Sequence, residues 1–240
     1  MRCRNSHSGL LVACMGLLSS AAFGDGSVVD KIYHPYVEQL EWEVEWRAVQ
    51  ERKPPASNEA RVATHRLGVG RAVSEFVFAE VYVIGREGSD REFRVDAWEV
   101  EALWQMSEQG EYVVDYGLLF ELEKYRYDEI WEYATTLLLE KEVGRVSATA
   151  NLSVIYEWGD DIADEFETAA ALQARYRYSQ ALEPALELYM GEDTLALGPM
   201  VQGLARLGSR QALRWEAGVV WGLDTVTADY TLRAVLEYEF

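Results

Sequence analysis

The sequence predicts an all-β protein, a single antiparallel transmembrane β-barrel of about 12 strands that follows an N-terminal signal peptide. The first residues have the order of an export signal, the rest of the chain alternates apolar with polar residues, and this alternation continues to the terminal Phe240. In a soluble sandwich the apolar sides would face a core. In a barrel they face lipid, and the charged sides face the lumen. The many aromatic rings and carboxylates favour the barrel.

Residues 1–24 are predicted to form the signal peptide and residues 25–240 the barrel. Two arginines precede an apolar run over 10–18, and small residues lead to the predicted cleavage point after Ala22 or Gly24. The apolar run is too short for a membrane-spanning helix, which needs roughly 20 residues.

The composition excludes several kinds of site and partner. The chain has 41 acidic and 22 basic residues, so no nucleic-acid partner is expected. Cys3 and Cys14 leave with the signal peptide, and we therefore expect no disulfide, thiolate metal site or cysteine nucleophile. No motif for a cofactor or a metal-binding loop is found, so none is expected. Lipid attachment at Cys14 is an alternative, but the apolar run continues past this residue, which favours ordinary cleavage.

Twelve segments alternate with a period of two, separated by turn residues or charges. In the first of them, tryptophans share one face and glutamates the other, a separation that a helix would not give. In another segment the apolar face changes phase near Ala97 and Trp98, which predicts a β-bulge. The predicted strands are 39–48, 62–71, 76–86, 93–106, 112–124, 130–143, 145–158, 165–178, 184–190, 196–207, 212–223 and 230–240.

The predicted connections alternate between tight and longer ones. Since the strand count is even, this alternation places both termini at the end with the tight turns, which in an outer membrane is the periplasmic end. The tight connections lie near 73–75, 107–110, 143–145, 180–182 and 208–210, and the longer ones near 51–61, 86–92, 124–129, 158–165, 190–196 and 223–229.

Tryptophans on the apolar face are predicted to mark the membrane interfaces, with the lipid bilayer as the partner of that face. The alternative is that these rings fill the core of a soluble fold, which could not easily house so many of them. The predicted interface tryptophans are Trp42, Trp46, Trp98, Trp104, Trp131, Trp158, Trp215 and Trp221.

The last strand, which carries Tyr238 and ends on Phe240, resembles the assembly signal of Gram-negative outer-membrane β-barrel proteins. The segments 35–37, 65–70 and 117–121 are loosely similar to copper-resistance-type barrels of an uncharacterised family. This resemblance implies export, residence in the cell outer membrane and insertion by the barrel-assembly machinery.

The polar faces of the predicted strands define the residues expected to line the lumen. Acidic residues outnumber basic ones there, so an open lumen is expected to prefer cations. The predicted acidic residues are Glu41, Glu43, Glu45, Glu80, Glu99, Glu101, Glu121, Glu123, Glu140 and Glu237, and the basic ones are Arg47, Arg175, Arg177, Arg206, Arg214 and Arg233. Of these, Arg214 and Arg233 are expected near the glutamates of the first strand, because the first and last strands close a barrel.

These residues leave two main functions open. One is a small porin-like channel that prefers small cations, and the other is a closed barrel whose lumen charges pair with one another and whose role is structural or surface interaction. A third candidate, a membrane-embedded hydrolase, is weak because His34 is expected on the periplasmic side and His65 has no Ser or Asp partner nearby in sequence. A site for Ca²⁺ or Mg²⁺ built from Glu41, Glu43, Glu99 or Glu101 is a further hypothesis, preferred over catalysis by paired carboxylates.

Overall fold

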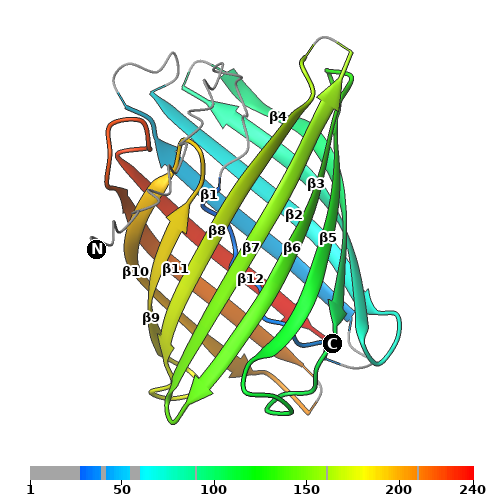
Figure 1. Cartoon of the computed structure of the whole chain (residues 1–240), viewed down its shortest axis with the longest axis vertical. Coiled ribbons are helices and arrows are strands. Elements are labelled where there is room, and N and C mark those ends of the chain that lie inside the picture. Colours follow the sequence, from blue (N-terminus) through cyan, green and yellow to red (C-terminus); the bar gives the residue numbers. More distant parts are fainter. Residues whose placement is uncertain (1–27, 39–41, 55–59, 90, 161, 210) are drawn as a thin grey trace, which may run out of the picture.

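The computed structural model describes residues 28–38, 42–54, 60–89, 91–160, 162–209 and 211–240, and it is a closed antiparallel barrel (Figure 1). Each strand pairs with its neighbours in sequence, and β1 pairs with β12 from Glu43 opposite Glu239 to Arg52 opposite Tyr230, which closes the wall. No helix in the described part of the chain is long and apolar enough to cross a membrane. The predicted fold class is confirmed. The predicted signal peptide and Glu41 lie outside the described residues.

The twelve strands agree with the predicted segments to within a few residues at most ends, because alternation is a local property of the sequence. β1 differs most, since it continues past the predicted end and Arg52 still pairs with Arg61 and Tyr230. The strands are β1 Trp42–Arg52, β2 Arg61–Ala72, β3 Val77–Gly88, β4 Arg91–Gln105, β5 Asp115–Tyr125, β6 Ile130–Val143, β7 Val146–Gly159, β8 Glu165–Tyr176, β9 Glu183–Met190, β10 Leu195–Arg206, β11 Ala212–Gly222 and β12 Tyr230–Glu239.

The predicted β-bulge is confirmed in β4. Ile84 of β3 pairs with Ala97 and Gly85 pairs with Val95, so Asp96 is the extra residue. Asp96 and Ala97 are both buried, at 7% and 1% exposure, whereas the side chain that follows them is half exposed. The bulge therefore re-aims the strand and keeps the lipid-facing residues outside on both sides of it.

The two ends of the barrel do not differ in connection length, contrary to the prediction. The connection 106–114 lies at the end with the tight turns, and 89–90 lies at the opposite end. β5 begins later than predicted because the chain before it forms a loop of its own, in which Asp115 accepts a hydrogen bond from the backbone of Gly110 at 2.9 Å. The turn at Gly144 is tight as predicted, and its φ of 63° is one that glycine adopts readily.

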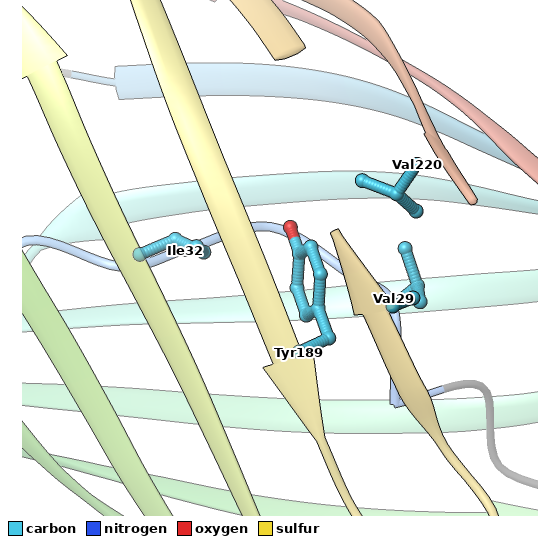
Figure 2. Packing of buried hydrophobic residues seen from close by; sticks show 5 residues of the cluster. Val29, Ile32, Tyr189 and Val220 are labelled. Carbon is cyan, nitrogen blue, oxygen red and sulfur yellow. The ribbon is translucent and has the colours of Figure 1, made fainter. Parts of the chain in front are cut away.

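Residues 28–38, here called the inner segment, run inside the barrel before β1 begins (Figure 1). Val29 and Ile32, at 3% and 1% exposure, pack against Tyr189 of β9 and Val220 of β11 (Figure 2). Burial of these apolar side chains fastens the segment to one side of the wall. His34 belongs to this segment, precedes the first strand as predicted and lies beside Glu140 of β6.

The bulge makes a prediction about deletions in β4. Deleting Asp96 should give a barrel that still folds. Val95 and Ala97 then become adjacent, keep their present partners on β3 and continue the alternation of outward and inward side chains. Deleting Val100 should prevent folding. Glu99 and Glu101 then become adjacent, and because adjacent strand residues point to opposite faces, one of the two glutamates must face lipid. The check is the folded fraction after refolding into detergent, read as the heat-dependent shift in electrophoretic mobility. Equal folding of the two deletion variants would contradict this description of the strand.

Candidate functional site

The outer face of the wall carries the predicted aromatic residues. All 8 tryptophans lie at outward positions, and most are close to a strand end, where a membrane interface would be, although Trp46 and Trp98 lie nearer the middle of their strands. Trp131 and Trp158 stack with ring centroids 6.4 Å apart, which joins β6 to β7 at one end of the barrel. At the other end Tyr238 and Phe240 stack at 5.5 Å.

His65 also lies on this outer face. Its ring lies 6.0 Å from that of Trp46 and 6.0 Å from that of Phe93. Within the described part of the chain, the contacts of His65 are with these two aromatic rings, and such an outward-facing histidine gives no support to the hydrolase hypothesis.

The inward positions carry the predicted acidic residues. Glu43 and Glu121 are partly buried, and seven others are buried, namely Glu45, Glu80, Glu99, Glu101, Glu123, Glu140 and Glu237. The basic residues divide into two groups. Arg47 and Arg233 are buried, and Arg175 is partly buried against Glu140 and Glu183, at 3.5 Å from each. Arg214, Arg177 and Arg206 lie closer to the ends of the barrel, with Arg177 in the turn after β8 and Arg206 exposed at the end of β10.

Arg47 is the main link between the wall and the inner segment. Its guanidinium, only 1% exposed, lies 2.8 Å from the Asp30 carboxylate and 2.7 Å from the Glu45 carboxylate, and it donates to the Tyr33 hydroxyl at 3.0 Å. Tyr82 of β3 completes the group by donating to Glu45 at 3.2 Å. A buried arginine is stable only when its donors are satisfied in this way.

Lys31 of the inner segment lies among carboxylates of β1 and β12. Its ammonium is 2.6 Å from Glu45 and also contacts Glu237. Burial alone would lower the pKa of Lys31, but Glu237 and Glu45 outweigh this effect and raise the pKa well above its usual value. The ammonium therefore stays charged and offsets the charge of these carboxylates.

The rest of the inner segment is held by hydrogen bonds to other strands. Asn151 of β7 bonds both backbone groups of Tyr33, at 2.8 and 2.9 Å, and Tyr33 donates through its hydroxyl to Glu101 at 2.9 Å. His34 lies 2.5 Å from Glu140 of β6, and Tyr36 donates to Asp115 of β5 at 2.8 Å. These contacts reach strands on several sides of the barrel, so the segment crosses the lumen.

Arg233 lies elsewhere than predicted. It pairs with Glu187 at 3.0 Å and Glu216 at 2.8 Å, and not with the glutamates of β1, because its register position is opposite Val49 and Gly218. It also donates to the Asp30 carbonyl. Arg214 is near the predicted place, since it bonds Glu239, which lies opposite Glu43.

Sequence reasoning missed the inner segment because it has no period-two pattern. A usable signal was present in its composition, since Val28, Val29, Ile32, Tyr33, Tyr36 and Val37 make it too apolar for a solvated tail between an export signal and a strand.

Inward carboxylates lie directly opposite one another on successive strands. One row runs from β4 to β8 and a second from β3 to β5. Like charges opposite each other on neighbouring strands are destabilising, so these rows need compensation or serve a function. The first row is Glu99, Glu123, Glu132, Glu157 and Glu165, and the second is Glu80, Glu101 and Glu121.

Most of the first row, and Glu121 of the second, border a cavity of about 140 Å³ inside the barrel. Seven carboxylates and three cationic groups line it, the latter being Lys31, Arg66 and Arg86. Arg66 of β2 bonds Glu99, and Arg86 lies 3.6 Å from Asp96. The cavity is therefore a polar space with an excess of acidic groups, suited to holding cations and water.

No family model and no curated protein sequence matches this chain. Its structure is similar to that of KdgM porin in complex with disordered oligogalacturonate, with a TM-score of 0.54 and 11% identity over 82% of this chain and 98% of that chain. A second KdgM porin structure gives a TM-score of 0.51 with 12% identity over 82% and 98%. An outer membrane channel from Pseudomonas putida F1 gives 0.54 with 11% identity over 85% and 96%. At these identities the likeness shows the fold, which is that of outer-membrane β-barrels.

The network around Arg47 makes a prediction about stability. Arg47→Met should lower the free energy of unfolding by about 3–5 kcal/mol, because Asp30 and Glu45 are left buried without their partner. Arg206→Met is the control, since Arg206 is exposed and its loss should change the free energy of unfolding by less than about 0.5 kcal/mol. Urea unfolding of both variants, followed by tryptophan fluorescence, measures the difference. A similar small effect at both positions would show that Arg47 does not fasten the inner segment.

Proposed function

We propose that this protein is an outer-membrane channel that passes small cations and whose path is narrowed by the inner segment. The observation that carries the proposal is the set of carboxylates that face one another at inward positions and border the cavity. The proposal includes export by the signal peptide 1–24, termini on the periplasmic side and insertion by the barrel-assembly machinery through Tyr238 and Phe240.

The charge of the interior supports cations as the transported species. Rings of carboxylates in a narrow path attract cations and repel anions. One structural neighbour, KdgM porin, holds an oligogalacturonate, a chain of acidic sugars. A polyanion of that kind would be repelled by the glutamate rows of the present barrel, so the shared fold is proposed to serve a solute of opposite charge.

The position of the inner segment supports the proposal that the conduction path is narrow in this structure. Its contacts to Glu45 of β1 through Lys31 and to Asn151 of β7 through Tyr33 place it across the lumen between walls that lie on different sides. Most of these contacts are polar, and such contacts can be exchanged for water. Displacement of the segment is therefore proposed to widen the path.

A second candidate is a closed barrel with a structural or surface-interaction role. It is favoured by the ion pairs that fill part of the lumen, above all those of Arg47 and Arg233 with their carboxylates. Transport is preferred over this role because the cavity and its excess carboxylates are not needed for closure, and it is preferred over catalysis because the neighbours of the same fold are a porin and a channel.

Current through a planar bilayer tests the proposal and separates the two candidates. The refolded mature chain should give a small conductance with a cation-selective reversal potential under a salt gradient. A variant that lacks residues 28–38 should conduct several-fold more, because the segment no longer crosses the lumen. Silence from both proteins, each shown to be folded, would reject the channel and leave the closed barrel.

Selectivity tests the role of the carboxylates. Glu132→Gln combined with Glu167→Gln should lower the ratio of cation to anion permeability, because both side chains border the cavity. Glu75→Gln is the matched control, since Glu75 is exposed in the turn between β2 and β3. Reversal potentials under the same gradient give the ratio. An unchanged ratio in the double variant would show that ions do not pass these carboxylates.

A further inference from the structure

Two trios of glutamates have the same local geometry inside the barrel. In each trio, one carboxylate oxygen from every member lies within 4.8 Å of the others. The first, here called the lysine trio, is Glu43, Glu45 and Glu237, and the second, here called the open trio, is Glu99, Glu101 and Glu121. Of the glutamates named from sequence for a hard-cation site, Glu43 belongs to the lysine trio, and Glu99 and Glu101 belong to the open trio.

The lysine trio already contains a cation. The Lys31 ammonium lies 2.6 Å from Glu45 and contacts Glu237, and Arg47 lies 2.7 Å from Glu45 on the other side. Three converging carboxylates are thus compensated by positive groups of the chain itself, which is the usual requirement for buried charge.

The open trio has no lysine in the corresponding place among the described residues. Arg66 bonds Glu99, while Glu101 accepts a hydrogen bond from the neutral Tyr33 hydroxyl at 2.9 Å and Glu121 lies 3.4 Å from the Thr136 hydroxyl. Among the residues that the structure describes, the guanidinium of Arg66 is thus the one positive group in contact with the open trio.

A fourth carboxylate adds an independent observation. Glu123 lies directly opposite Glu99, borders the same cavity and is only 5% exposed. Its Oε1 has no hydrogen-bond partner in the described part of the protein, and its other oxygen lies 3.7 Å from Arg66. A buried carboxylate oxygen without a donor is costly, and Glu123 borders the same cavity as Glu99 and Glu121.

We propose that Glu99, Glu101, Glu121 and Glu123 bind a divalent cation of the Ca²⁺ type. All the ligands are oxygens, and four flexible glutamates on two neighbouring strands can supply several of the six to eight oxygens that Ca²⁺ takes, with water for the rest. Mg²⁺ requires near-ideal octahedral geometry and gives up its water reluctantly, so it fits a cluster of this kind less well. The cavity of about 140 Å³ has room for an ion with several waters.

The bound ion would also stabilise the inner segment, which narrows the lumen. Tyr33 of the inner segment bonds Glu101, so the ion lies next to that segment and stabilises its position. Binding does not depend on conduction, because a barrel that passes no current still has these carboxylates. Failure of one proposal can therefore be told apart from failure of the other.

Calorimetric titration of CaCl₂ into the refolded mature chain tests the site, in an uncharged detergent after treatment with a chelator. The parent protein should bind one Ca²⁺ in the barrel, and Glu121→Gln and Glu123→Gln should each weaken binding by at least about tenfold. Glu43→Gln is the matched control, since it removes the same charge from the lysine trio and should leave the affinity unchanged.

Thermal unfolding checks that the variants are folded. Without Ca²⁺, Glu121→Gln should melt no lower than the parent, because it removes one of several facing carboxylates. Added CaCl₂ should raise the melting temperature of the parent and of Glu43→Gln but not that of Glu121→Gln. The proposal is overturned if Ca²⁺ binds the parent and the two open-site variants equally, if Glu43→Gln weakens binding as much as they do, or if the parent binds no Ca²⁺.

Discussion

Burial of charge inside a closed wall is the constraint on which the rest of this structure depends. When β1 pairs with β12, every second residue of each strand points into a confined space. A charge there is costly unless an opposite charge or hydrogen bonds accompany it. Glu45 and Arg47, at 0% and 1% exposure, meet this requirement on the same strand, and Asp30 of the inner segment completes the group.

The inner segment meets the same constraint along its whole length. It places Lys31 among glutamates of β1 and β12, and it places the Tyr33 hydroxyl against Glu101. Its apolar residues bury themselves against Tyr189 and the small core around it, so the segment is held by both packing and polar contacts. One short stretch of chain therefore fills part of the lumen and neutralises part of its charge.

The compensation is incomplete on the side of the barrel formed by β4 to β8. Glutamates face one another across these strands in register, and the cavity beside them has more carboxylates than cations. A purely structural interior would have no use for this arrangement, because like charges opposite each other are destabilising. The excess is the physical basis both for the cation path and for the bound divalent ion that we propose.

The sequence by itself determined the strands, their inward and outward faces and a bulge near Ala97, because the alternation of side chains along a strand is a local property. It also identified which glutamates point inwards, Glu45 and Glu123 among them. Only the tertiary structure decided their partners. Tyr33 bonds Asn151 across 118 residues of sequence, and Arg233 reaches Glu187 and Glu216 instead of the glutamates of β1. Such contacts depend on closure of the barrel and on a segment without periodicity, and a local pattern carries no information about either.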